Sequence, residues 1–506
     1  MKTVLSDMPK LEAAAHSLSF SDYNGRLLTY QGNLYRAIPA DQAGLYRALF
    51  QQGVVQALVE ERLLVDTWIA PLELAPYKLV LQHRKLPLVS YPQEWCAAML
   101  KVAALHHIDC CLALDRYDLT TDDAHPINIL FEGTRPLFVD FGSINRLRKD
   151  IWYPWPWPPY EQFCQMFLYP LLLAAQGHSR LARVSMHDFE SGVLRAELSA
   201  LIWRPWTRLR FAEVGKAWMQ KVGYRSLGRL LLWATQIGTT RRAFLQQVRQ
   251  EIEGISLPDL QSPPDLRSPK KGNQAIASRP KNCLPANYDL VEKILSELSP
   301  STVLDVNSGQ HQGSYALLAA ALGSQVVAID PDEAPVEQLY FQAKRQALPI
   351  LPLIMNFASP SSGLSNRFFE PAHQRLKCDL VLAVALDESL VIKRGFNFIV
   401  ERLAIFSRRW LLIEFIPRAG ATMATRWRER VVDCSWYSLE NFLDTLKTHF
   451  NRVEMMPSSP SPRVLLLCEK AVGEDALLNG DLSAKDALHN PTDIAASDSL
   501  AEGYLN

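Results

Sequence analysis

The sequence predicts two domains of different fold class, an α+β domain in its first half and an α/β domain with a largely parallel sheet in its second half. Three observations support this division. The chain has 506 residues, more than one hydrophobic core usually holds. A proline-rich segment, residues 255–285, separates two halves of comparable size. Strands and helices alternate strictly only after that segment, as in a doubly wound sheet.

The first half, residues 1–254, mixes a β-rich start with a helical remainder. The pattern predicts a hairpin over 26–38, helices around 42–60 and 93–112, two short strands joined at Gly133, and mostly helix over 160–252. The segment "WYPWPWPPY" interleaves aromatic rings with prolines. We interpret it as a cap on the helical part, with stacking on a sugar or a partner as the alternative.

Prolines at the density found in residues 255–285 prevent helices and sheet ladders, which predicts an extended linker. Residues 286–470 then alternate between apolar strands and amphipathic helices. The last two strands are separated only by "PSSPSP", too short for a parallel crossover, so they form an antiparallel edge hairpin. The prediction is a seven-stranded mixed sheet, followed by a flexible acidic tail over 471–506.

Composition excludes several classes of function. The formal net charge is zero, so the chain as a whole gives no electrostatic reason to expect nucleic acid. The apolar runs are too short to span a bilayer, and the N-terminus has no signal core, so we expect neither a membrane span nor secretion. The eight cysteines form no C-x-x-C pair, which favours reduced thiols in a cytoplasmic protein. The "HHIDCC" stretch is not expected to bind a metal.

Acidic residues end the first two strands of the second half. Asp305 ends "TVLDV" and runs into the turn "NSGQHQG", and Asp330 ends "QVVAID". A glycine turn lets the backbone approach a cofactor, and a carboxylate after the second strand accepts hydrogen bonds from both ribose hydroxyls. Asn356 follows the third strand, "LPLIM".

This half resembles the class I S-adenosylmethionine-dependent methyltransferases over roughly residues 286–470. The resemblance implies a Rossmann-like sheet. It also implies a cofactor site formed by six residues at the ends of the first three strands and in the loops after them, namely Asp305, Asn307, Gly309, His311, Asp330 and Asn356. The turn departs from the family pattern, because Asn307 and His311 stand where glycines are usual. Asparagine tolerates left-handed backbone, whereas histidine is harder to accommodate. The assignment therefore requires that His311 leave room for an adenosyl group and that Asp330 face it.

Methyl transfer needs alignment of the acceptor and, for an oxygen nucleophile, a base. Asp387 and Glu388 lie just beyond the fourth strand, where an acceptor would approach, and Glu414 ends the fifth. Each is also explained as a solvated carboxylate or a charge at a helix start.

The first half carries a second motif. "DAHPIN" supplies Asp123 and Asn128, and "VDFG" supplies Asp140, with a hairpin between them. Phosphoryl transfer needs a carboxylate for the acceptor hydroxyl and oxygen ligands for magnesium. The spacing resembles the aminoglycoside-phosphotransferase and kinase-like families, which implies Asp123 as the catalytic carboxylate, Asn128 and Asp140 as metal ligands, and Mg-ATP as cofactor. However, no glycine-rich loop is visible, and Arg36 stands where a lysine is expected, so we expect a degenerate domain.

The whole arrangement resembles a family of bacterial nodulation-related class I methyltransferases over most of residues 20–470. The resemblance implies an S-adenosylmethionine-dependent methyltransferase whose kinase-like half binds substrate or regulates, acting on an unidentified small-molecule or carbohydrate-like acceptor. Two alternatives stay open. One is a small-molecule phosphotransferase using Asp123, Asn128 and Asp140, and the other is a non-enzymatic binding protein with two degenerate sites.

Overall fold

The structure of the chain is a computed structural model. It describes residues 3–4, 14–15, 25–147, 155–188, 190–201, 240–258, 285–360, 370–384, 386, 388–417 and 436–471. These fall into two compact units, Met1–Lys377 and Cys378–Asn506. Most of the predicted linker and tail lies outside the described residues, so the domain boundaries at 254, 285 and 470 stay predictions.

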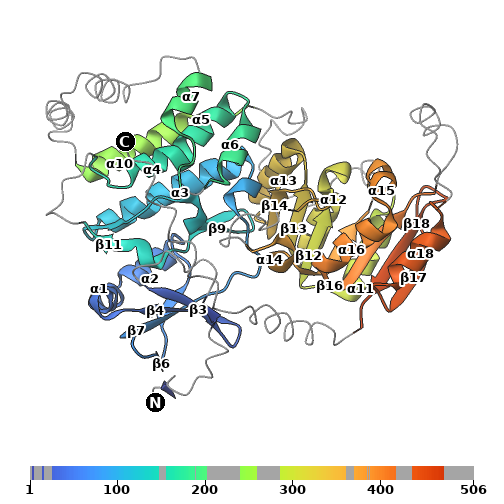
Figure 1. Ribbon diagram of the computed structural model, residues 1–506, viewed down its shortest axis with the longest axis horizontal. Helices are drawn as coiled ribbons and strands as arrows, with labels where there is room; N and C mark the ends of the chain where they lie inside the picture. The colour runs from blue at the N-terminus through green and yellow to red at the C-terminus, as the bar shows by residue number, and fades with distance from the viewer. Residues whose placement is uncertain are drawn as a thin grey trace, which may run out of the picture. The chain divides into compact units, whose positions relative to one another are not determined.

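The first unit begins with a five-stranded antiparallel sheet (Figure 1). In spatial order its strands are β2 (Ala14–Ala15), β3 (Arg26–Tyr30), β4 (Asn33–Ile38), β7 (Leu79–His83) and β5 (Thr67–Ile69). The predicted hairpin over 26–38 is confirmed as β3 and β4. Two helices, α1 (Ala40–Gln51) and α2 (Val54–Glu60), replace the single stretch expected near 42–60, since Gly53 between them takes φ 72°.

A long helix, α3 (Ala97–Asp115), forms the core of the rest of this half. Among the described residues it is the one helix long and apolar enough to cross a membrane, but 67% of the window is buried inside the fold, as in a core helix. Strands β8 (Leu119–Thr121) and β11 (Ile144–Arg146) pair, and β9 (Ile129–Glu132) and β10 (Arg135–Phe138) form the predicted hairpin.

Helices and helical turns follow: α4 (Tyr160–Phe163), a π-helical turn (Cys164–Leu168), α5 (Tyr169–Ala175), α6 (Ser179–Ser185), α7 (Arg195–Leu201) and α10 (Arg241–Gly254). The described part of the aromatic–proline segment packs into them. Trp157 is fully buried, and the Trp155 ring stacks on Phe244 of α10 at 6.1 Å between centroids. This packing is that of a cap on the helical part.

The remainder of the first unit is the start of an α/β sheet. Its elements are α11 (Tyr288–Leu298), β12 (Thr302–Val306), α12 (Ser314–Ala321), β13 (Gln325–Asp330), α13 (Glu333–Gln346), β14 (Ile350–Ile354) and α14 (Ala372–Arg375). Strand β13 pairs in parallel with both β12 and β14, and all three are almost wholly buried. Such continuous burial is why the strands read as apolar runs.

The second unit continues the alternation. Its elements are β15 (Cys378–Ala383), α15 (Glu388–Arg394), α16 (Phe396–Phe406), β16 (Ser407–Phe415), α18 (Leu439–Lys447), β17 (Arg452–Pro457) and β18 (Val464–Glu469). The predicted closing hairpin is confirmed as β17 and β18. Strand β18, antiparallel to both β16 and β17, lies between them, so β17 is the edge strand.

The seven strands have the order β14-β13-β12-β15-β16-β18-β17, which confirms the predicted seven-stranded mixed sheet. Strand order reverses after β12, the first strand of this half in the sequence.

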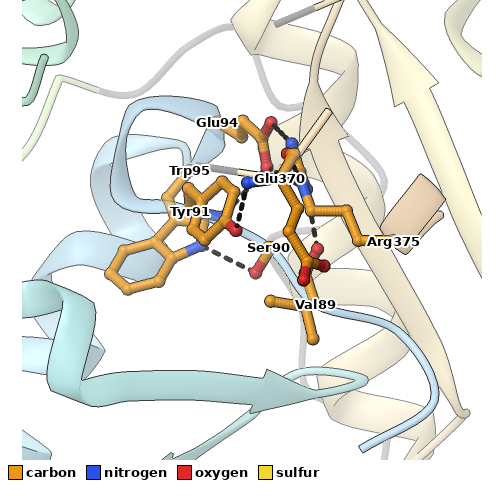
Figure 2. A network of polar contacts seen from close by, with 7 residues as sticks. All are labelled: Val89, Ser90, Tyr91, Glu94, Trp95, Glu370 and Arg375. Atoms are coloured by element: carbon orange, nitrogen blue, oxygen red, sulfur yellow. Dashed lines mark hydrogen bonds and ion pairs between the residues drawn. The ribbon is translucent and has the colours of Figure 1, made fainter. Parts of the chain in front are cut away.

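Within the first unit, a buried ion pair joins the N-terminal half of the chain to the part that follows the proline-rich segment (Figure 2). Glu94, in the turn just before α3, faces Arg375 of α14, and their side chains are only 2% and 1% exposed. Arg375 Nη1 donates to Glu94 Oε2 at 2.9 Å and to the Val89 carbonyl at 2.7 Å. The guanidinium also lies over the Tyr91 ring, 4.3 Å from its centroid.

Candidate active site

The loop after β12 folds as the altered glycine turn requires. Asn307 takes left-handed backbone with φ 57° and ψ 44°, a conformation that asparagine tolerates better than most residues. Residues 308–311 then form one turn of 3₁₀ helix, and Gly313 takes φ 68° before α12 begins. A Cβ on Gly313 would lie 2.7 Å from Leu339 of α13, so only glycine fits without a shift.

Asp330, at the end of β13, faces this loop. Its Oδ2 accepts a hydrogen bond from the Gly309 N–H at 2.8 Å, and its Oδ1 accepts one from the Asp332 N–H at 2.9 Å. Burial raises the pKa of the Asp330 carboxyl, while these two N–H groups act against that rise. A Cβ on Gly309 would stand 2.7 Å from Oδ2, so the close approach of loop and carboxylate depends on that glycine.

Asp305 and His311 form a buried polar pair inside the loop. His311 Nε2 lies 3.5 Å from Asp305 Oδ1, and the two side chains are 4% and 0% exposed. The imidazole packs on the Tyr315 ring at 4.4 Å between centroids. Within the described residues, neither oxygen of Asp305 and neither ring nitrogen of His311 has a hydrogen-bond partner. Buried polar groups normally have partners, so these four atoms point to a polar ligand.

The remaining candidates of the second half are only partly described. Asn356 is exposed after β14, and its Oδ1 accepts the Ala358 N–H at 2.9 Å. Asp387 lies outside the described residues. Glu388 begins α15, but nothing is described of its side chain. Glu414 is buried and accepts the Ser458 hydroxyl at 2.6 Å, so it holds the β17–β18 hairpin to β16.

The predicted phosphoryl-transfer residues are also brought together, within the first unit. Asn128 Nδ2 donates to Asp123 Oδ1 at 2.7 Å. Asp140 follows the β9–β10 hairpin, and its Oδ1 accepts the Gly142 N–H at 3.2 Å. The same Oδ1 lies 3.3 Å from Arg36 Nη2, which comes from β4 of the antiparallel sheet. Arg36 thus reaches the carboxylate expected to ligate magnesium.

Arg36 lies in a largely buried environment. Its side chain is 5% exposed. Nearby His83 bonds Thr67 Oγ1 through Nδ1 at 2.9 Å, and burial together with the Arg36 charge lowers the pKa of His83 to about 3. No group of three or more His, Cys, Asp or Glu placed to hold a metal occurs among the described residues. His106 and His107 of the "HHIDCC" stretch turn to different partners, the Leu63 carbonyl and a cluster of aromatic rings.

One residue that sequence reasoning missed contacts both halves. Glu333, the first residue of α13, binds the N-terminus of α3 and Arg183 of α6. A carboxylate at a helix start is common and is explained by the helix dipole alone, so the sequence contained no signal for this role.

No protein-family model matches the chain. The chain is similar to the nodulation protein NoeA of Rhizobium meliloti (strain 1021), with 26% identity over 483 residues that cover 90% of this chain and 95% of that protein. Among solved structures it is similar to the 16S rRNA methyltransferase RsmC of T. thermophilus, with 18% identity, 39% of this chain and 45% of that chain covered, and a TM-score of 0.25. It is also similar to the bifunctional kinase-methyltransferase WbdD, with 14% identity, 36% and 38% covered, and a TM-score of 0.27. The chain spans less than half the length of both solved chains.

Proposed function

We propose that this chain is an S-adenosylmethionine-dependent methyltransferase whose first half binds substrate or regulates. The observation that carries the proposal is the buried pair Asp305 and His311, with four polar atoms lacking partners beside a glycine-bearing loop. The methionyl end of the cofactor carries one ammonium and one carboxylate. An acceptor-only carboxylate and an imidazole lying 3.5 Å apart complement that zwitterion.

The other cofactor residues have distinct tasks in this proposal. Asp330 would accept the ribose hydroxyls, because each of its oxygens uses one lone pair for a backbone N–H and retains another. Asn307 and Gly309 bring the loop backbone close to the ligand. Asn356 would lie near the adenine. When bound, the cofactor supplies an electrophilic methyl group, so the chain's residues need only bind, orient and exclude water.

Asp387 and Glu388 stay the proposed sites for a general base, since they follow β15 in the sequence. Glu414 is less suited, because the Ser458 hydroxyl already occupies it. The rings of Phe415, Trp436 and Tyr437 pack together near the end of β16. Phe415 is buried, whereas Trp436 and Tyr437 are partly exposed. We propose that these two rings contact a small-molecule or carbohydrate-like acceptor.

Cofactor binding tests the proposal directly. We expect S-adenosylmethionine and S-adenosylhomocysteine to raise the melting temperature of the full chain and to bind measurably in calorimetry. Asp305→Asn and Asp330→Ala should weaken binding at least tenfold, because each removes an acceptor for a charged or hydroxyl donor. Asp444→Asn removes a carboxylate that is 68% exposed on α18, and it should leave the affinity unchanged. Absence of binding to the wild type would overturn the proposal.

The second candidate is a small-molecule phosphotransferase. The Asn128–Asp123 hydrogen bond favours it, since it preorganises the carboxylate that would orient an acceptor hydroxyl. The Arg36–Asp140 ion pair opposes it, because the guanidinium occupies the oxygen that would ligate magnesium. Thermal shift with ATP and magnesium decides between them. Failure of both ATP and S-adenosylmethionine to bind would favour the third alternative, a non-enzymatic binding protein with two degenerate sites.

We further propose a bacterial, cytoplasmic setting without a nucleic-acid partner. The bacterial source of the NoeA relative supports the first point. The six cysteines in the described part of the chain are buried thiols, as is usual in a reducing compartment. The formal net charge of zero gives no footprint for nucleic acid.

A further inference from the structure

Helix α13 forms one wall of the proposed cofactor loop. A Cβ on Gly309 would lie 2.9 Å from Pro335, and one on Gly313 would lie 2.7 Å from Leu339. Both contacts are with side chains of α13. Because both glycines already touch the helix, a shift of α13 moves the loop with it.

The first residue of α13 is held by the N-terminal half. Glu333 Oε1 accepts the Ala97 N–H at 3.1 Å, and its Oε2 lies 2.5 Å from Arg183 Nη1. The Glu333 side chain is 12% exposed and that of Arg183 is 20% exposed, so water screens the pair only in part. Both partners belong to the first unit but precede the proline-rich segment, 236 and 150 residues away in sequence.

Glu333 caps the N-terminus of α3. Ala97 is the first residue of that helix, and the N-cap residue Cys96 gives no side-chain cap. The first N–H groups of a helix have no partner within it, and the helix dipole favours a negative charge there. Glu333 supplies both a hydrogen-bond acceptor and that charge.

The same residue stands next to the ribose-binding turn. Only two residues separate Glu333 from Asp330, and the Asp332 N–H is bonded to Asp330 Oδ1 at 2.9 Å. A continuous set of contacts therefore runs from Arg183 and Ala97 through Glu333 and Asp332 to Asp330, and on to the Gly309 N–H.

We propose that Glu333 is a positioning residue through which the N-terminal half sets the geometry of the cofactor loop. The proposal rests on the proposed function and deepens it. The first half of the chain is then part of the cofactor site's support. Removing or displacing the first half of the chain would weaken cofactor binding without removing any group that touches the cofactor.

The test compares five variants of the full chain with the wild type by calorimetry with S-adenosylmethionine. Glu333→Ala loses both bonds, and we expect its Kd to rise about tenfold, within the usual range of coupling between sites. Glu333→Gln keeps an acceptor for Ala97 and loses the ion pair, so its Kd should rise less. Arg183→Gln should match Glu333→Gln, and the double variant should be no weaker than either. Glu297→Gln makes the same change in an exposed pair on α11 and should bind as the wild type does.

Hydrogen exchange gives a readout that needs no cofactor. In Glu333→Gln, the peptide containing Gly309 and the peptide containing Asp332 should exchange faster, while peptides from β15 and β16 keep their protection. Because this experiment uses Glu333→Gln, it still tests the positioning role if Glu333→Ala fails to fold.

The outcomes separate the two proposals. A wild type that binds no cofactor sinks the proposed function, yet faster exchange at Gly309 in Glu333→Gln still supports the positioning role. A wild type that binds, with Glu333→Ala within twofold of its Kd and with unchanged exchange at Gly309, overturns the positioning role alone.

Discussion

Replacing Arg375 by methionine tests the buried ion pair between the halves of the first unit. The substitution keeps an unbranched apolar side chain but leaves Glu94, whose side chain is 2% exposed, without its counter-charge. It also removes donors to the Val89 and Glu370 carbonyls and the guanidinium over the Tyr91 ring. Figure 2 shows these groups converging on one side chain.

The expected loss of unfolding free energy comes from the Glu94 carboxylate, which remains buried without a counter-charge. Removing one partner of a buried pair costs about 3–5 kcal/mol, since the other charge remains out of water. In the double variant Arg375→Met with Glu94→Gln no charge stays buried, and the glutamine oxygen still accepts the Tyr91 N–H. We expect the double variant to recover roughly 2 kcal/mol of that loss.

Arg409→Met is the matched control. Arg409 also pairs with a carboxylate, Glu469, and lies over a ring, Trp410, but its side chain is 49% exposed. Arg409→Met should lower the free energy of unfolding by less than about 1 kcal/mol.

Urea unfolding followed by tryptophan fluorescence measures the stability of each variant, read at the first transition because a two-unit chain need not unfold in one step. Exchange of the peptide spanning Val89–Met99 reports the same event locally. The reasoning is wrong if Arg375→Met costs no more than Arg409→Met, or if the double variant is less stable than the single one.

Three further predictions follow from single sites. Gly309→Ala places a Cβ 2.7 Å from Asp330 Oδ2, so it should weaken S-adenosylmethionine binding, whereas Gly44→Ala, with open space around it, should not; calorimetry compares them. Burial lowers the pKa of His107 to about 3. Below pH 6.5 the unfolded chain therefore binds a proton at His107 that the folded chain does not bind. Stability that is present above pH 6.5 is lost as the pH falls toward 3. At pH 5 that loss is about 2 kcal/mol, and His107→Phe should remove it from urea unfolding compared at pH 7 and pH 5; an unchanged difference contradicts the assignment. Arg36→Lys shortens the cation that faces Asp140 and should increase any thermal shift by ATP and magnesium; a smaller shift than that of the wild type would show that Arg36 itself holds the nucleotide.

Periodicity was enough to predict the sheet, whereas local backbone chemistry indicated only that the loop after its first strand was possible. The apolar runs of β12 and β13 identify buried parallel strands, and the left-handed backbone of Asn307 is one that asparagine tolerates. The position of β18 between β16 and β17 did not follow, because a short turn fixes that two strands pair but not which of them joins the sheet. Glu333 was missed for a related reason. Its partners lie 150 or more residues away, and no local pattern records them.

The two motif departures have the same physical form but opposite consequences. Arg36 stands 3.3 Å from Asp140, and His311 stands 3.5 Å from Asp305, so each altered position brings a nitrogen-bearing side chain to its motif's own acid. A guanidinium is always charged and donates only, so Arg36 satisfies Asp140 permanently and competes with magnesium. An imidazole ring always carries at least one N–H, so in the proposed function His311 adds a donor for a carboxylate while Asp305 accepts from an ammonium. In the proposed function, Arg36 thus stands where it would compete with a metal ion for Asp140, while His311 adds to the groups that would bind the cofactor. This difference is the physical reason for our proposal that the chemistry of the chain lies in its second half.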